Sequence, residues 1–202
     1  MSLIARIHGG MVFARRVRVL ADHIEPHLPR NATVLDIGCG DGQLAALLEA
    51  RRPDIAARGV DVLVRKVTAI PIDHYDGLHL PASDGAYDVA LLIDVLHHAD
   101  DPLAVLREAA RVARLVVIKD HSRKGVLAGP TLRLMDWVGN ARHGVALPYN
   151  YWSPAQWSEA FEALELEPSA MNRRLGLYSA PASWLFDRSL HFVAALRPRA
   201  VA

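Results

Sequence analysis

The sequence has few cysteines and no long hydrophobic run. Its 202 residues include one cysteine, Cys39, which excludes an internal disulfide and a zinc site built from several cysteines. No signal peptide is visible, and charged residues interrupt every apolar run well before the roughly eighteen residues that a membrane-spanning helix needs. We therefore expect a cytoplasmic protein without a transmembrane segment, in keeping with a lone reduced cysteine.

An excess of charge of one sign is also missing. The chain carries 23 basic and 22 acidic residues, a net charge of +1 at pH 7, so we expect no nucleic-acid partner. The length suits one domain with a core of its own. The hydrophobic share of 51% leaves room for an apolar substrate and for peripheral contact with a membrane. No feature of the sequence indicates an oligomeric state.

The most informative stretch is residues 33–48, which read TVLDIGCGDGQLAALL. Its β-branched and aliphatic start predicts a buried strand, and its leucines at helical spacing predict a helix. Between them, Gly38, Gly40 and Gly42 indicate a turn with positive φ or a backbone that a ligand approaches closely. A dinucleotide fingerprint needs a third glycine where Gln43 stands, and no Tyr-x-x-x-Lys pair is present. Both observations disfavour an NAD-dependent dehydrogenase.

The segment LDIGCGDG resembles motif I of the class I, Rossmann-like methyltransferases that depend on S-adenosylmethionine (SAM), in their small-molecule branch. The resemblance implies that SAM lies against Asp36, Gly38, Cys39 and Gly40. A second strand over residues 55–60 leads into a carboxylate at the distance where this family binds the SAM ribose, with an apolar residue beside it for the adenine. These two residues are Asp61 and Val62, although an aspartate that only caps a turn remains the alternative.

Two further segments strengthen the resemblance. Residues 75–88, YDGLHLPASDGAYD, resemble the adenine-side segment of the family, which implies cofactor contacts from Asp76, Gly77 and Leu78. For Asp76, a purely turn-forming role is an equal alternative. Residues 93–98, IDVLHH, resemble the segment after the fourth strand where cofactor and acceptor meet, which implies that Asp94 borders SAM.

Together these patterns predict a single α/β domain. We expect a three-layer, seven-stranded and mostly parallel sheet whose last strand is antiparallel. Residues 1–29 would form a helical cap with a basic face, which either covers the sheet or meets a membrane surface. Residues 30–119 would form the cofactor-binding core, with an edge strand over 70–75 and a fifth strand over 115–118. Residues 120–152 would form a helical lid, and residues 153–202 a last helix and two strands.

Three histidines follow strand ends and are candidates for a catalytic base. An imidazole suits proton transfer near neutral pH, and a base is needed if the acceptor is a hydroxyl or a carboxylic acid. The candidates are His97, His98 and His121, each with a structural role as the alternative. Adjacent imidazoles are not expected to converge on one ion, so we predict no metal. Asp120 and His121 should point in opposite directions on an extended chain.

The lid carries an aromatic set, Trp137, Tyr149, Tyr151 and Trp152, that either packs the lid or lines the acceptor pocket. Residues 94–97, DVLH, lack the Asn/Asp-Pro-Pro-Tyr/Phe motif of the family's adenine- and glutamine-methylating members. We therefore do not expect methylation of a nucleic-acid base. The strand-end histidines favour an oxygen acceptor over nitrogen or carbon, and the hydrophobic lid and N-terminal segment suit a small, apolar, natural-product or lipid-like molecule, with S-adenosylhomocysteine (SAH) as product. The alternative is an inactive SAM- or SAH-binding scaffold protein.

Overall fold

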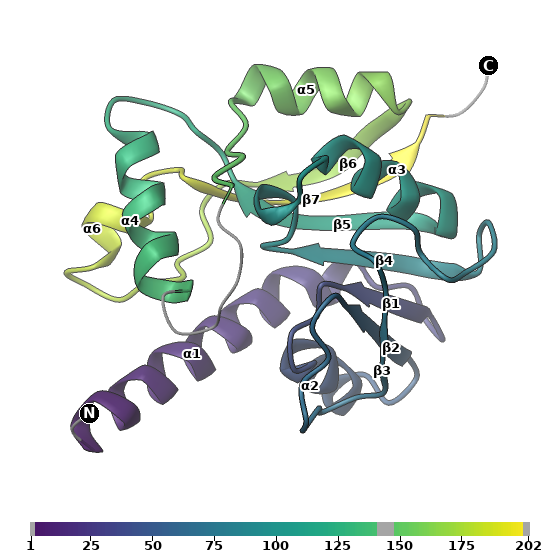
Figure 1. The fold of residues 1–202 in the computed structure, drawn as a ribbon, viewed down its shortest axis with the longest axis horizontal. Helices are drawn as coiled ribbons and strands as arrows, with labels where there is room; N and C mark the ends of the chain where they lie inside the picture. The colour runs from purple at the N-terminus through teal and green to yellow at the C-terminus, as the bar shows by residue number, and fades with distance from the viewer. Residues whose placement is uncertain (1–2, 141–147, 200–202) are drawn as a thin grey trace.

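The computed structural model describes residues 3–140 and 148–199, which form one seven-stranded sheet between two layers of helices (Figure 1). The strand order is β3-β2-β1-β4-β5-β7-β6, and only β7 runs antiparallel to its neighbours. The predicted fold class is therefore confirmed. The strands are β1 (Thr33–Ile37), β2 (Ala56–Asp61), β3 (Ile72–His74), β4 (Tyr87–Ile93), β5 (Ala113–His121), β6 (Leu166–Asn172) and β7 (His191–Pro198).

The helices form two separate cores with the sheet. On one face, α1 and α2 pack buried side chains such as Ile24 and Leu48 against β1 and β4; on the other, α3 and α5 bury Leu106 and Trp157 (Figure 1). The helical segments are α1 (Leu3–Ile24), η1 (Glu25–His27), α2 (Gln43–Arg51), η2 (Leu96–His98), α3 (Pro102–Val112), α4 (Ala128–Asn140), α5 (Pro154–Ala163) and α6 (Ser183–Phe186). No helix within the described residues meets the length and hydropathy needed to cross a membrane.

Local sequence explains where the helices begin. Asp101 caps α3 by accepting a hydrogen bond from the backbone N–H of Ala104 at 3.0 Å, with Pro102 in the first turn. Ser153 and Gln156 form a capping box at the start of α5. The predicted cap, residues 1–29, contains one α-helix, α1, which ends at Ile24, and the short η1, which contains Pro26.

The main departure from the predicted elements is the length of β5. The strand continues to His121, three residues beyond the predicted end at Ile118, because the antiparallel β7 pairs with it as far as His121↔His191. Asp120 and His121 are therefore strand residues, and the lid begins after them. At the other edge, β3 is shorter than expected, and no helix is found among residues 62–71.

Candidate active site

The glycine turn after β1 forms a backbone wall at the carboxyl end of the sheet. Gly38, Gly40 and Gly42 all have positive φ, as the sequence predicts. A Cβ at Gly38 would lie 2.7 Å from the Cγ2 atom of Val95, so only a bare backbone fits there. The carboxyl ends of β1, β2 and β4 meet at this point, which is where ligands bind in open α/β sheets. The residues present thus fit a cofactor that lies against the turn.

Asp61 lies at the end of β2 and holds this turn. Its Oδ2 atom accepts a hydrogen bond from the backbone N–H of Gly40 at 2.8 Å, and its Oδ1 atom accepts one from the N–H of Leu63 at 2.8 Å. Val62 lies beside Gly77, since a Cβ at Gly77 would come within 3.2 Å of the Cγ1 atom of Val62. Asp61 is therefore adjacent to the glycine turn and Val62 to Gly77, and the ribose and adenine roles remain predictions.

Asp76 has a defined structural role. Its Oδ1 atom accepts hydrogen bonds from the backbone N–H groups of Leu78 at 2.8 Å and His79 at 2.6 Å, and Oδ2 lies 2.8 Å from Nδ1 of His79. These bonds hold the pKa of Asp76 below its usual range. The turn-forming alternative is thus present in the structure, and contact with the adenine stays a prediction.

Burial changes the protonation of the two polar residues on the turn. It raises the pKa of Asp36 to about 7, with a further contribution from the charge of Asp61. Burial and the same acidic neighbours raise the pKa of the Cys39 thiol. Cys39 is therefore a neutral thiol at physiological pH and not a nucleophile.

A buried ion network lies next to the glycine turn, on the other side of β4. Asp94, directly after β4, has a positive φ and forms ion pairs with Lys119 of β5 and Arg16 of α1. The Lys119 side chain is 0% exposed, and its burial lowers the pKa of the ammonium group against the attraction of Asp94. Burial would raise the pKa of Asp94, but the two cations outweigh it and hold that pKa well below its usual range. Arg16 thus ties α1 to the strand ends.

A second chain of polar contacts runs through His97. The Nδ1 atom of His97 lies 2.7 Å from Oδ1 of Asp120, and its Nε2 atom lies 3.5 Å from Oδ2 of Asp136, which also accepts a hydrogen bond from the hydroxyl of Tyr151. Burial lowers the pKa of His97, but the attraction of Asp120 and the other carboxylates outweighs it and raises the pKa to about 10. His97 is therefore a cation at neutral pH.

His121 lies against His97 but is neutral where His97 is a cation. Its Nδ1 atom lies 3.3 Å from Nδ1 of His97, 3.4 Å from Oδ1 of Asp120 and 3.6 Å from Oδ1 of Asp94. The expectation that Asp120 and His121 diverge is therefore wrong, because Oδ1 of Asp120 accepts a hydrogen bond from the backbone N–H of His121 at 2.6 Å and so lies beside its ring. Burial, Lys119 and His97 lower the pKa of His121 to about 4, so it is neutral at pH 7.

The other two histidines nearby are also neutral. The ring centroids of His97 and His98 are 4.0 Å apart, and burial and the charge of His97 lower the pKa of His98. Burial lowers the pKa of His191 in β7 well below its ordinary value, and neither of its ring nitrogens has a hydrogen-bond partner among the described residues. His191 lies 4.9 Å from His121, centroid to centroid.

Side-chain atoms that could bind a metal ion lie closer together than the sequence indicates. One atom each from Asp94, His97, Asp120 and His121 lies within 4.8 Å of the others, and so do atoms of His97, His98 and Asp136. The expectation that neighbouring imidazoles do not converge is thus wrong in this tight 3-10 turn. Arg16 and Lys119 already neutralise Asp94, and the proton on His97 balances further carboxylate charge. These cations lower the net negative charge that the four residues would offer a metal ion.

The aromatic set separates into two places. Tyr149, Tyr151 and Trp152 line a pocket of about 440 Å³ between α4 and the start of α5. Tyr151 connects this pocket to His97 through Asp136. Trp137 lies apart from them, 60% exposed on the outer side of α4.

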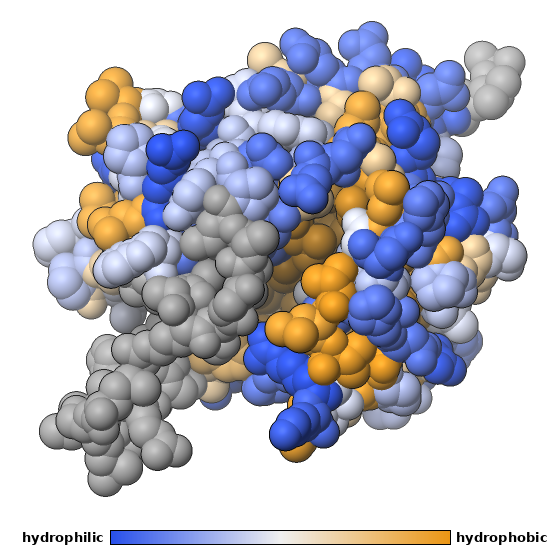
Figure 2. All heavy atoms as spheres, in the orientation of Figure 1, coloured by the Kyte–Doolittle hydropathy of each residue, from blue (hydrophilic) through white to orange (hydrophobic). Residues whose placement is uncertain are grey.

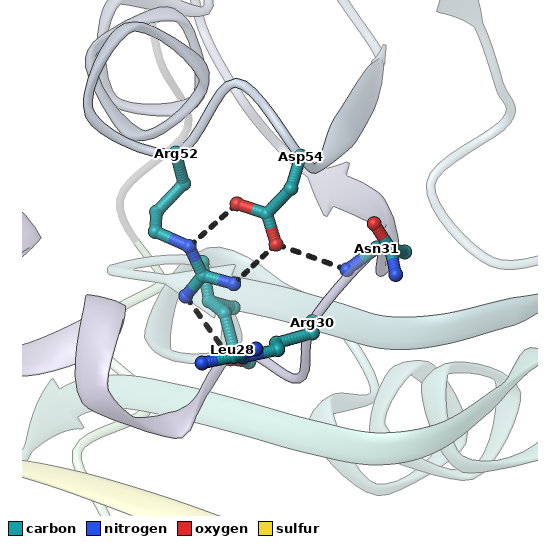
Figure 3. A pocket seen from close by; sticks show the side chains of 5 residues that line it. All are labelled: Leu28, Arg30, Asn31, Arg52 and Asp54. Carbon is teal, nitrogen blue, oxygen red and sulfur yellow. Dashed lines mark hydrogen bonds and ion pairs between the residues drawn. The ribbon is translucent and has the colours of Figure 1, made fainter.

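A second pocket lies on the opposite side of the sheet, where the parallel strands begin. It has a volume of about 680 Å³ and lies at the start of β1 and β2, lined by Arg52 and Asp54 (Figure 3). Figure 3 shows the two side chains joined to each other, with Asp54 also accepting the backbone N–H of Asn31 at 3.0 Å. Since ligands bind at the carboxyl ends of parallel strands, this pocket is not the candidate site.

Four residues of the ion and histidine network were not predicted from the sequence. Arg16, Lys119, Asp136 and His191 come from four segments that are far apart in the chain. One signal was available: the polar triplet from Lys119 to His121 follows an apolar strand without a turn residue, which indicates buried charge rather than a surface loop.

A ribose contact from Asp61 has a measurable consequence. Asp61→Ala should weaken SAH binding by about 1.5–3 kcal/mol, roughly 10- to 150-fold, because the hydrogen bonds to a charged acceptor are lost. Calorimetric titration measures this affinity. An SAH analogue without the ribose hydroxyls separates the two roles: the variant should bind both ligands alike if Asp61 holds the ribose, whereas a wild-type preference that survives in the variant would show that Asp61 only supports the turn.

The raised pKa of His97 predicts a pH dependence of stability. The folded protein keeps this proton up to about pH 10, whereas an unfolded histidine loses it near 6.5. The stabilisation is complete below about pH 6.5 and is lost as the pH rises toward 10, at up to about 1.4 kcal/mol per pH unit. Urea unfolding between these pH values measures it. In His97→Gln the fall should shrink, and an equal fall in both proteins would contradict the assignment.

Comparison with known proteins identifies the domain. A family described as "Methyltransferase domain" matches residues 12–169. The 27-O-demethylrifamycin SV methyltransferase of Amycolatopsis mediterranei is 31% identical in an alignment of 110 positions that covers 47% of this chain and 40% of that protein, so the chain spans less than half of this relative.

Solved structures show the same fold at low identity. A chain from the complex between the Haloferax volcanii Trm112 methyltransferase activator and its methyltransferase superposes with a TM-score of 0.70 at 17% identity, covering 95% of both chains. The Burkholderia thailandensis 1,6-didemethyltoxoflavin-N1-methyltransferase, solved with its substrate and SAH, gives 0.66 at 17% identity over 92% of this chain and 79% of that one. The chain therefore belongs to the methyltransferase domain family, and its domain is a class I, Rossmann-like, SAM-dependent methyltransferase domain.

Proposed function

We propose that this protein transfers a methyl group from SAM to a small, apolar or lipid-like molecule, at an oxygen atom. The observation that carries the proposal is the contact between the glycine turn and the segment that bears the histidines. Gly38 leaves no room for a Cβ beside Val95, which lies two residues before His97, and His97 lies against His121. The relatives and solved neighbours include both O- and N-methyltransferases, so the choice of oxygen rests on the histidines.

The chemistry needs alignment more than reactive side chains. SAM supplies an electrophilic methyl group on a sulfonium, which an acceptor displaces in line. The protein's contribution is to hold the acceptor in line and to exclude water, and such orientation contributes roughly 7–11 kcal/mol in favourable cases. The glycine turn, Asp61 and Asp94 would hold the cofactor, while the ion pairs of Asp94 fix α1 beside it.

The histidines divide the acid–base work by their charge states. His121 is neutral and would take the proton of an acceptor hydroxyl. His97 keeps its proton between Asp120 and Asp136, so it positions Asp120 and, through that carboxylate, the ring of His121. His98 is a second neutral imidazole, half-buried beside His97.

The pocket of Tyr149, Tyr151 and Trp152 is the proposed acceptor site. It joins flat apolar walls to a few polar groups, as small-molecule sites do. Tyr151, which lines this pocket, donates a hydrogen bond to Asp136, and Asp136 lies 3.5 Å from His97. The pocket is therefore close to the histidine cluster.

Two measurements test the proposal in order. Calorimetric titration with SAH should show binding, and its absence would remove the cofactor assignment. Incubation with SAM labelled at the methyl group and fractionated metabolite and lipid extracts should then yield a labelled product that base hydrolysis or mass spectrometry assigns to oxygen. SAH binding without any labelled product would favour the scaffold alternative, and a product labelled at nitrogen would contradict the oxygen preference.

A further inference from the structure

The solvent-facing side of α4 is apolar where a surface helix is ordinarily polar. Leu127, Pro130, Leu134 and Trp137 fall on one exposed stripe, interrupted only by Arg133, while Leu132 and its neighbours on the opposite side are buried. A helix on the surface of a soluble domain normally turns charged residues outward. The lid helix therefore has apolar side chains on its exposed side as well as on its buried side, and the exposed side suits an apolar environment.

The short helix α6 extends this surface. Trp184 is 76% exposed and Leu185 is also exposed, and α6 lies beside α4, where Arg188 donates a hydrogen bond to the hydroxyl of Thr131 at 3.3 Å. Val126, 88% exposed, stands just before α4. In Figure 1 these helices form the left end of the molecule, where Figure 2 shows hydrophobic side chains at the surface. We name this surface the α4/α6 edge: Val126, Leu127, Leu134, Trp137, Trp184 and Leu185.

The exposed charges of residues 122–137 and 183–190 are positive. The carboxylates within residues 122–137 and 183–190 turn inward, since Asp136 binds Tyr151 and Asp187 accepts the backbone N–H of Tyr178 at 3.2 Å. The cations of the same segments are exposed: Arg123, Lys124, Arg133 and Arg188. The described part of this surface thus combines uncovered aliphatic and tryptophan side chains with four exposed cations, and its one half-buried carboxylate, Asp187, is bound to the backbone.

We propose that the α4/α6 edge docks on an anionic lipid bilayer. Tryptophan favours the membrane interface, and basic residues near it are attracted to anionic headgroups by about 1 kcal/mol each. Arg133 also lines the pocket of Tyr149 and Trp152, so docking turns the mouth of that pocket toward the lipid. If the proposed function holds, the bilayer then supplies the acceptor; the docking itself does not depend on methyl transfer.

Vesicle flotation tests the docking with the full chain. The protein should float with vesicles of equal parts phosphatidylcholine and phosphatidylglycerol and should bind vesicles of phosphatidylcholine alone at least tenfold more weakly. Tryptophan emission should shift to shorter wavelength on binding. Trp137→Ser with Trp184→Ser should abolish both signals, and Arg133→Gln with Arg188→Gln should weaken binding about fivefold per residue, which corresponds to ~1 kcal/mol each.

Matched controls keep the test decisive. Val67→Ser, which changes an equally exposed apolar residue between β2 and β3, should bind like wild type. Retained SAH binding shows that the tryptophan variant is folded, and a failure of SAH binding in wild type would contradict the proposed function without affecting the docking. Absence of flotation, binding that ignores lipid charge, or a wild-type dimer that the tryptophan changes convert to a monomer would each overturn the proposal.

Discussion

Asp94→Ala is expected to destabilise the protein by about 3–5 kcal/mol, because it leaves the buried Lys119 without its counter-ion. Arg16, the other partner of Asp94, is partly exposed and can turn to water, but the Lys119 side chain is fully buried between β4 and β7. The ammonium group must then either stay charged in an apolar environment or lose its proton. Urea unfolding without ligand measures the change in the free energy of unfolding.

Two comparisons isolate the cause. Combining Asp94→Leu with Lys119→Met removes both buried charges and should recover most of the lost stability, since replacing a buried pair by apolar residues is often neutral. Asp73→Ala, which breaks the exposed pair with Arg58, should cost at most about 1 kcal/mol. A loss for Asp94→Ala as small as that of Asp73→Ala would show that Lys119 finds another partner.

His121→Gln is expected to lower kcat by about 10²–10⁴-fold with little change in SAH affinity, as removal of a general base does. The depressed pKa of His121 adds a distinctive pH profile. In wild type, kcat should stay level from pH 8 to 6 and fall only toward about pH 4, because His121 remains a free base over that range. Steady-state kinetics with the acceptor found by labelling measure both effects.

Competing explanations predict different outcomes. An ordinary exposed histidine as the base would make kcat fall near pH 6.5. His27→Gln, at the amino-terminal side of the sheet, should leave kcat unchanged and serves as the matched control. An unchanged kcat in His121→Gln would show that methyl transfer proceeds by alignment alone or that His98 takes the proton.

Much of the fold can be predicted from the sequence because it depends on local patterns. The strand, glycine turn and helix of residues 33–48, the start of α5 at Ser153 and the lid helix over Ala128–Asn140 all follow from hydrophobic periodicity, caps and glycine positions. The end of β5 does not, because the residues that extend it to His121 are polar and are held by pairing with β7, about seventy residues later.

The same distinction between local and long-range interactions applies to the candidate site. The sequence by itself determined the wall that we predict to hold the cofactor, since Gly38, Gly40 and Asp61 lie within one strand–turn–helix unit and the next strand. Only the tertiary structure decided the charge network, in which Arg16 of α1 meets Asp94, and His97 of η2 meets His121 of β5. Neighbouring carboxylates keep His97 charged, whereas burial, Lys119 and His97 keep His121 neutral. Such contacts and desolvation depend on packing between distant segments, which no local pattern encodes.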